Sequence, residues 1–192
     1  LYGIDEMGST AENVAADFKI SREDQDQMAL RSQNNAEDAQ SNGNLAEEIL
    51  AVKIPQRKGD DIIFDKDEHL RPGSTIEGLQ KLRPAFQEGG SVTAGNSSGI
   101  NDGSCALIIA SEEAANEHGL TPKARILGLA AGGVAPRVMG IGPVPSTKKL
   151  MTRLGLKIDD LDIIELNEAF AAQGLAVLRE LGVADDDCRV NP

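Results

Sequence analysis

The pattern of apolar and polar positions separates a polar, helix-rich first part of the chain from a last third in which strands and helices alternate. In the last third, apolar runs predict strands at 125–130 and 162–166, and a further strand begins at 188–191. Helices are predicted between and after them, at 146–154 and 169–181. This alternation is typical of parallel strands joined by right-handed crossovers, so the predicted fold class is α/β.

Two helices in the first part are predicted from the serines that precede them. Ser9 and Glu12 have the spacing of a capping box, in which each side chain satisfies a free backbone N–H group, and they predict a helix through Phe18. Ser21 repeats the arrangement with an Asp in place of the Glu, and its helix is predicted to run to about Asn42. That helix has only a thin apolar stripe, so we expect it to lie on a surface.

The middle of the chain contains short predicted strands and a glycine-rich run. The strands are predicted at 49–54 and 61–64, around a basic turn. Five glycines fall within residues 89–103, and glycine allows a backbone to approach a ligand closely. The apolar run at 106–110 predicts a buried strand, and Ser111 is expected to cap the helix that follows.

Composition excludes several classes of function. A formal net charge of −12 is unsuited to non-specific nucleic-acid binding, which requires a basic surface. No apolar stretch approaches the roughly 20 residues that span a bilayer, so we expect no membrane partner and a cytoplasmic protein. The acidic clusters at 60–68 and 185–187 lack the alternation of a calcium loop, and no metal site is predicted.

No nucleophile is evident among the cysteines and histidines. Cys105 begins an apolar run, where cysteine usually packs as a small hydrophobe, and Cys188 follows three aspartates, which are unfavourable neighbours for a nucleophilic thiolate. His69 and His118 are expected to face solvent. A group of basic residues permits two interpretations, ordinary surface charge or an anion site. The group comprises Lys53, Arg57, Lys58, Arg71, Lys81 and Arg83.

Asn167 stands where the apolar run of a predicted strand ends and a helix begins. At the carboxyl end of a parallel strand, a residue faces the crevice in which α/β sheets bind ligands. An asparagine at this position can cap the helix, or it can hold a substrate oxygen or a water molecule through its amide. The residues alone leave both interpretations open.

Four stretches of sequence resemble motifs of the thiolase family, enzymes that cleave or form β-ketoacyl-CoA. NEAFAAQ at 167–173 is similar to the family's NEAF motif. The other three follow in the family's order and are MGSTAENVA at 7–15, KLRPAF with the glycine-rich run at 81–103, and VMGIGPVP at 138–145. Within the family, the chain most resembles thiolases that act on 3-oxoadipyl-CoA (β-ketoadipyl-CoA), with acetyl-CoA acetyltransferases next.

The resemblance implies an internal fragment of the five-layered αβαβα thiolase fold. Residues 1–100 would form most of the loop domain, 101–119 the end of the N-terminal domain, and 120–192 the beginning of the C-terminal domain. Thiolases acylate a Cys from the N-terminal half, and they use a GHP histidine and a CxGxG cysteine near the C-terminus. None of these motifs occurs in this sequence, so we expect the fragment alone to be inactive. The intact enzyme is expected to be a homo-tetramer or a dimer.

The resemblance also implies roles for individual residues. Asn167 would position a catalytic water near the thioester oxygen, and Met7 and Phe170 would line the acyl pocket. CoA, a substrate rather than a bound cofactor, would contact Arg71, Leu82, Phe86, Ala94 and Ser98. Arg137 is a candidate for recognising the terminal carboxylate of 3-oxoadipyl-CoA.

The implied reaction is thiolysis of 3-oxoadipyl-CoA to succinyl-CoA and acetyl-CoA in the intact parent. The alternatives are an acetoacetyl-CoA thiolase and a non-catalytic thiolase-like module that binds CoA.

Overall fold

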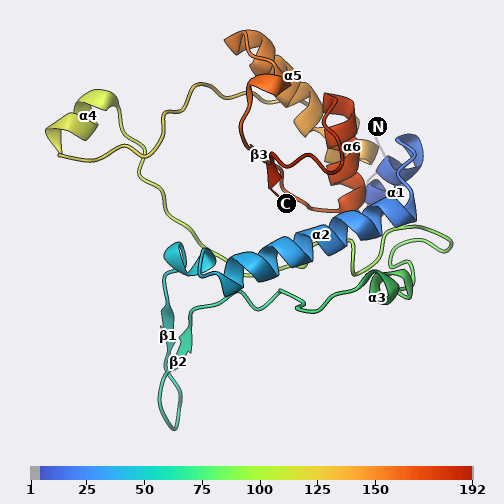
Figure 1. Ribbon diagram of the computed structural model, residues 1–192, viewed down its shortest axis with the longest axis horizontal. Helices are drawn as coiled ribbons and strands as arrows, with labels where there is room; N and C mark the ends of the chain where they lie inside the picture. The colour runs from blue at the N-terminus through green and yellow to red at the C-terminus, as the bar shows by residue number, and fades with distance from the viewer. Residues whose placement is uncertain (1–4, 192) are drawn as a thin grey trace.

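The computed structural model describes residues 5–191, and three helices form its centre (Figure 1). Helix α1 (Met7–Asp17) and helix α2 (Arg22–Ser41) both pack against α6 (Ala171–Leu181). Val14, Met28 and Leu175 are each at most 3% exposed and belong to one apolar cluster between these helices. Two segments far apart in sequence, 7–41 and 171–181, therefore share a core.

The remaining elements are short, with one exception. Helix α5 (Pro143–Leu154) lies beside α6 and begins three residues earlier than predicted. The others are α3 (Ile76–Gln80), α4 (Glu112–Glu117) and the 3-10 helices η1 (Leu45–Glu47), η2 (Pro136–Ile141) and η3 (Ile158–Asp160). No helix in the described part of the chain is long and apolar enough to cross a membrane.

The parallel pairing predicted for the last third is present. Strand β3 (Ile164–Glu165) pairs in parallel with β4 (Val190–Asn191), with Ile164 opposite Val190, and α6 lies between them in the chain. Strands β1 (Val52–Ile54) and β2 (Ile62–Phe64) form an antiparallel hairpin that projects from the body (Figure 1). The α/β class is thus confirmed, although every strand is shorter than its apolar run.

Serine caps explain where two helices begin. Ser21 Oγ accepts a hydrogen bond from Asp24 N at 3.0 Å, and Ser111 Oγ accepts one from Ala114 N at 3.2 Å, as the sequence predicts. The prediction for Ser9 is wrong, because α1 begins earlier, at Met7. The carboxylate of Glu12 leaves the helix and binds other backbone groups instead.

The prediction that α2 lies on a surface is wrong for its first turns. Gln25 and Asp26 are fully buried, and Met28 and Ala29 pack inward, whereas the end of the helix is more exposed. Polar side chains are buried here because neighbouring segments supply hydrogen-bond partners to Asp26 and to the Gln25 amide nitrogen.

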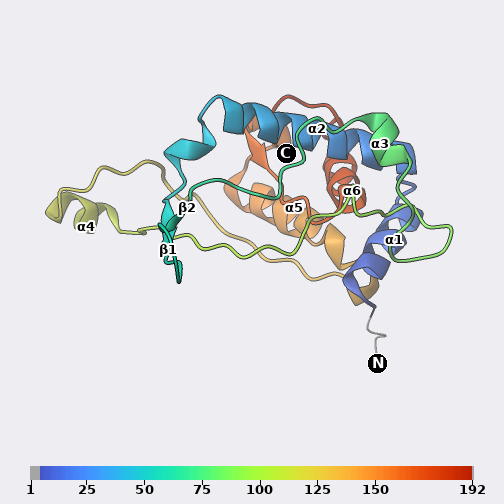
Figure 2. The same cartoon turned by 90° about the horizontal axis from the view of Figure 1, so that it is seen from below.

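The strands predicted at 106–110 and 125–130 are absent, and their apolar side chains are exposed. Leu107 is 83% exposed and Leu127 is 67% exposed. A strand needs a hydrogen-bonding neighbour, and the described residues contain none that pairs with either segment. Cys105 is exposed for the same reason, contrary to its predicted burial. Residues 100–130, which we call the arm, extend away from the helices with α4 near the tip (Figure 2).

Candidate active site

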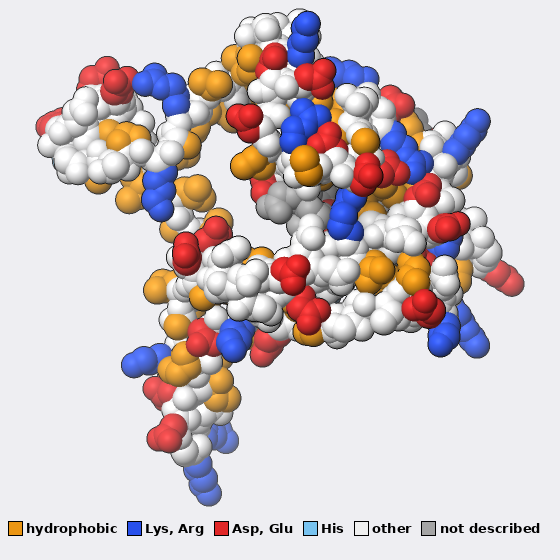
Figure 3. All heavy atoms as spheres, in the orientation of Figure 1, with side chains coloured by type: hydrophobic (Ala, Val, Ile, Leu, Met, Phe, Trp, Pro, Cys, Tyr) orange, Lys and Arg blue, Asp and Glu red, His pale blue; other side chains and the backbone are white. Residues whose placement is uncertain are grey.

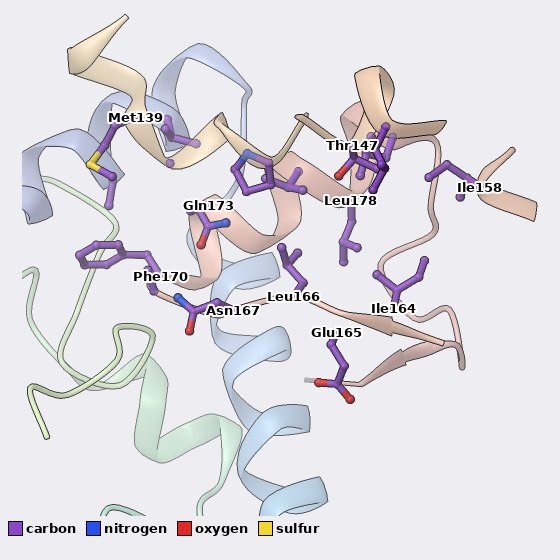
Figure 4. A pocket seen from close by; sticks show the side chains of 18 of the residues that line it. Met139, Thr147, Ile158, Ile164, Glu165, Leu166, Asn167, Phe170, Gln173 and Leu178 are labelled. Carbon is purple, nitrogen blue, oxygen red and sulfur yellow. The ribbon is translucent and has the colours of Figure 1, made fainter. Parts of the chain in front are cut away.

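Asn167 lies between β3 and α6, at the edge of a cavity (Figure 4). The N-cap of α6 is Phe170, three residues further on, and no side chain caps this helix. The Asn167 side chain makes no hydrogen bond to any residue among 5–191. Of the two interpretations of Asn167, the structure therefore excludes helix capping and leaves its amide available to a ligand.

The cavity beside Asn167 has a volume of about 580 Å³ and a mainly apolar wall. Met7 and Phe170, predicted to line an acyl pocket, both contribute to it. A few polar side chains interrupt the wall, namely those of Thr10, Thr147, Glu165, Asn167 and Gln173. An apolar cavity with few polar groups is the usual form of a site for an acyl group.

Glu168, the neighbour of Asn167, is directed toward α2 instead. The hydroxyl of Ser32 donates a hydrogen bond to Glu168 Oε2 at 2.6 Å. Burial raises the pKa of the Glu168 carboxyl, and the Ser32 bond and the charge of Arg31 oppose this shift only in part. Glu168 therefore belongs to a polar network behind the cavity, and Asn167 alone of the pair faces the cavity.

The glycine-rich run pairs directly with the NEAF segment. Ser98 N donates to Ala169 O at 3.1 Å, and Ala171 N donates to Asn96 O at 2.9 Å. Between these bonds, Ser97 and Phe170 form an antiparallel bridge. The backbone of Ser98 is thereby fixed beside the junction that carries Asn167.

A second pairing brings Leu82 and Ala94 together. Ala85 N donates to Val92 O at 2.9 Å, which holds the two segments that carry these residues side by side. Gly95 permits the close approach, because a Cβ atom at this position would lie 2.6 Å from Leu82 Cδ1. Leu82 remains 38% exposed and can contact a ligand.

Phe86 connects these paired segments to the cavity. Its ring meets the ring of Phe170 edge to face, with centroids 6.1 Å apart and an angle of 83° between the planes. The Phe86 ring also lies directly on Gly8, where any Cβ atom would collide with it. The predicted CoA residues Leu82, Phe86, Ala94 and Ser98 thus lie on two paired segments, 79–86 and 91–98, beside Phe170. We call the surface between these two segments the groove.

Comparisons with known proteins identify the family of the chain. Residues 2–113 match the family described as Thiolase, N-terminal domain, and residues 120–192 match Thiolase, C-terminal domain. The chain belongs to the thiolase family.

Among its relatives, the chain is 62% identical to the Beta-ketoadipyl-CoA thiolase of Pseudomonas putida over 100% of this chain and 48% of that protein. It is 58% identical to the 3-oxoadipyl-CoA/3-oxo-5,6-dehydrosuberyl-CoA thiolase of Escherichia coli K12, again over 100% of this chain and 48% of the relative. This thiolase chain therefore spans about half the length of these relatives.

Solved structures give the same result. The acetyl-CoA acetyltransferase of Bacillus anthracis superposes with a TM-score of 0.93 at 46% identity, covering 100% of this chain and 48% of that one. Human mitochondrial 3-ketoacyl-CoA thiolase superposes with a TM-score of 0.90 at 45% identity, covering 96% of this chain and 46% of that one. The fold of this thiolase chain is thus the fold of the corresponding half of these enzymes.

Arg71 of the thiolase chain is exposed. Its guanidinium donates to three backbone carbonyls of its own loop, including that of His69 at 2.8 Å. The His69 ring packs against Gly99, next to Ser98. The other basic residues do not form one patch, because Lys53, Arg57 and Lys58 belong to the β1–β2 hairpin, away from α3 (Figure 3).

Arg137 lies outside the cavity wall of this thiolase chain. Its guanidinium is ion-paired with Asp17, and its carbonyl accepts a hydrogen bond from Asn13. The suggestion that Arg137 recognises a substrate carboxylate therefore gains no support from its position.

The sequence does not single out Gln173, which lines the cavity, is 5% exposed, and has an Oε1 atom without a partner among the described residues. A polar residue on the apolar face of a helix is the signal that could have identified it. No group of His, Cys, Asp and Glu within residues 5–191 is arranged to hold a metal ion.

Proposed function

We propose that the full-length protein containing this chain is a thiolase that cleaves 3-oxoadipyl-CoA with CoA to give succinyl-CoA and acetyl-CoA. Relatives named for β-ketoadipyl-CoA share 53–62% identity with the chain over nearly its whole length. The Acetyl-CoA acetyltransferase of Chromobacterium violaceum, at 50%, is less similar and supports acetoacetyl-CoA as the second candidate substrate.

In the proposed reaction, the thiolate of an enzyme cysteine attacks the β-carbonyl carbon, and the bond between the α- and β-carbons of the substrate breaks. The acyl group stays on the cysteine as a thioester. The α-carbon keeps the electron pair of the broken bond, takes a proton from a general acid in the rest of the parent protein, and leaves as acetyl-CoA. The thiol of CoA then takes the acyl group from that cysteine. The nucleophilic cysteine and the GHP histidine would be supplied by the rest of the parent protein, since neither motif occurs in this sequence. This chain would supply the oxyanion side of the site and the groove for CoA.

The observation that carries the proposal is the Asn167 amide at the edge of an apolar cavity, where no residue among 5–191 bonds to it. An amide in this position can hold a water molecule that donates a hydrogen bond to the developing thioester oxyanion. Since Glu168 is bonded to Ser32 behind the cavity, no carboxylate from this motif would repel the negative charge at close range.

The groove is proposed to hold the pantetheine arm of CoA between Leu82 and Phe86 on one side and Ala94 and Ser98 on the other. Arg71, beyond Ser98, would meet the phosphates and the adenine, for which a guanidinium is suited. Met7 and Phe170 would contact the acyl group. CoA enters as a substrate, and the proposed chemistry requires no metal or resident cofactor.

The proposal extends to the organisation of the parent protein. Residues 1–100 would belong to its loop domain, 101–119 to its N-terminal domain and 120–192 to its C-terminal domain. The β1–β2 hairpin exposes Val52, Ile54, Ile62, Ile63 and Phe64, which supports assembly into a homo-tetramer or a dimer. We place the enzyme in the cytoplasm, without a nucleic-acid or membrane partner.

The test is a thiolysis assay of the full-length protein with 3-oxoadipyl-CoA and with acetoacetyl-CoA. We expect a higher kcat/KM for 3-oxoadipyl-CoA. A clear preference for acetoacetyl-CoA would transfer the substrate assignment to the second candidate. Binding of CoA without turnover of either compound would identify a non-catalytic CoA-binding protein and contradict the proposed reaction.

A further inference from the structure

Helix α2 carries a fully buried carboxylate, that of Asp26, which bonds to one residue of the same helix and to one residue 70 positions away. Its Oδ2 accepts a hydrogen bond from Arg22 Nε at 2.8 Å, and its Oδ1 accepts one from Asn96 Nδ2 at 3.0 Å. A buried carboxylate is costly unless it is paired and hydrogen-bonded, and both of its oxygens are used here. Asp26 is in neither the cavity wall nor the set of predicted CoA contacts.

Through Arg22, Asp26 is linked by hydrogen bonds to the segment that carries Leu82, which forms one wall of the groove. Arg22 Nη2 donates to Leu79 O at 2.7 Å and to Leu82 O at 3.0 Å. The Asp26 carboxylate fixes the guanidinium so that this nitrogen faces both carbonyls. The last turn of α3 and the residues after it are thereby tied to α2.

Through Asn96, Asp26 is linked by hydrogen bonds to the segment that carries Ala94 and Ser98, which forms the opposite wall. Asn96 Oδ1 accepts from Thr93 N at 2.7 Å, and its Nδ2 also donates to Ser91 O at 3.2 Å. These bonds close the turn that presents Ala94. The carbonyl of Asn96 accepts from Ala171 N, so the same residue is joined to the first residue of α6, next to the Asn167 junction.

We propose that Asp26 is the positioning residue of the CoA groove, holding its Leu82 wall through Arg22 and its Ala94–Ser98 wall through Asn96. This inference rests on the proposed function, because it takes the groove to be the site of the pantetheine arm. Asp26 touches no substrate. It joins one wall directly, at Asn96, and the other through Arg22. Glu12, the other buried charged side chain among residues 5–191, binds only the backbone of Ser91 and Val92 and the Ser91 hydroxyl.

The chemistry of the site requires a carboxylate. Both neighbours present N–H donors, so the residue between them must accept at both oxygens. In Asp26→Asn, one oxygen becomes an NH2 group, which then faces a donor from either Arg22 or Asn96. Rotation of the Asn96 amide does not relieve this conflict, because its Oδ1 is needed by Thr93 N. One wall must therefore lose its attachment.

The experiment measures KM for CoA and kcat for thiolysis in the full-length protein carrying Asp26→Asn. We expect KM to rise about tenfold, the effect of one lost hydrogen bond to a charged group, with kcat within about twofold of wild type. Asp24→Asn, the same substitution at an exposed ion pair of the same helix, should leave both constants unchanged. An unchanged KM, or a loss confined to kcat, would overturn the inference.

A second substitution that restores the lost hydrogen bonds distinguishes a positioning role of Asp26 from a general loss of stability. In the double variant Asp26→Asn with Asn96→Asp, the amide introduced on α2 donates to the carboxylate introduced in the turn, and Arg22 and Thr93 keep their acceptors. The hydrogen bond to Ser91 O is lost, so KM should return part of the way toward wild type. No improvement over Asp26→Asn alone would contradict the proposed connection.

If circular dichroism shows that the Asp26→Asn variant does not fold, the Arg22→Lys variant is measured in its place. This variant keeps a charge beside Asp26 but loses the fork that reaches Leu79 O and Leu82 O, so KM should still rise.

Direct titration with CoA distinguishes failure of this inference from failure of the proposed function. If wild type binds CoA without catalysing thiolysis, the proposed reaction is wrong. A Kd for CoA that is roughly tenfold larger for Asp26→Asn than for Asp24→Asn would then still support the positioning role. Equal Kd values for the two variants would overturn it. If wild type does not bind CoA, both proposals fail.

Discussion

The arm includes the last residues of the glycine-rich run, 100–103, yet it differs from the segments before it in how its backbone groups are hydrogen-bonded and how far its side chains are buried. We call α1, α2, α6 and residues 79–98 the packed half. There, Leu175 and Val14 are at most 1% exposed, and the buried carboxylate of Glu12 binds backbone N–H groups. In the arm, Ile108 is 85% exposed and the helix α4 is the one regular element.

The difference shows which kinds of structure this chain can complete by itself. A helix satisfies its own backbone hydrogen bonds, and an apolar face can pack on another helix of the same chain. A strand depends on neighbours, and the described residues provide none for the apolar segments of the arm. The groove lies in the packed half, and backbone bonds of Ser98 and Asn96 attach the segment that follows Asn167 to it.

The largest expected difference between the two regions concerns apolar burial. Leu175→Ala should lower the free energy of unfolding of the 192-residue chain by about 2–5 kcal/mol, because it leaves a cavity between three helices. Ile108→Ala should change it by less than about 0.5 kcal/mol, since its side chain is exposed. Urea unfolding monitored by circular dichroism measures both. Similar losses for the two variants would show that the arm is packed.

The next difference concerns carboxylates. Glu12 accepts hydrogen bonds from Ser91 N and Val92 N at 3.0 and 2.9 Å, so Glu12→Gln should cost about 1.5–3 kcal/mol. Glu112 pairs with Arg125 in the arm, where both side chains are mostly exposed, and Glu112→Gln should cost less than about 1 kcal/mol. The same unfolding measurement decides the order, and a larger cost for Glu112→Gln would reverse the comparison.

The smallest difference is a pair of opposite pH dependences. Burial raises the pKa of Glu168, so the folded state holds its proton more tightly than the unfolded state. The stability that wild type gains over the Glu168→Gln variant should therefore be greatest below about pH 4.5, and it should decrease as the pH rises through the raised pKa.

Glu113, in the arm, has its pKa lowered by its own backbone N–H group and by Ser111. Its contribution should be present above about pH 4.5 and should be lost as the pH falls. Thermal midpoints of wild type, Glu168→Gln and Glu113→Gln between about pH 3 and pH 7 test both signs. Parallel curves for the two variants would contradict them.

Local signals in the sequence predicted the elements that depend on local bonds. Ser21 and Ser111 start their helices, and the strand-to-helix change around Asn167 is where the pattern placed it. The capping box at Ser9 failed because Glu12 has stronger partners in a segment about 80 residues away. The prediction of strands in the arm was wrong, because an apolar run can form a strand only where a neighbouring strand is available to pair with it.

The candidate site was predictable to a similar degree. The resemblance named the residues around the groove, and the structure brings Leu82, Phe86, Ala94 and Ser98 together, although their roles remain predictions. The bond between Asp26 and Asn96 could not be predicted, because it joins polar residues 70 positions apart and neither lies in a recognisable pattern. Buried polar pairs of this kind follow from the fold rather than from a local motif.

The proposed action of the Asn167 amide on the reacting oxygen is tested by kcat of the full-length Asn167→Ala variant. We predict that kcat for thiolysis of 3-oxoadipyl-CoA falls about 10²–10³-fold, the effect of losing an oxyanion donor, with KM for CoA little changed. Asn116→Ala, at an exposed position of α4, should retain wild-type kcat. A wild-type kcat for Asn167→Ala would show that its amide does not act on the reacting oxygen.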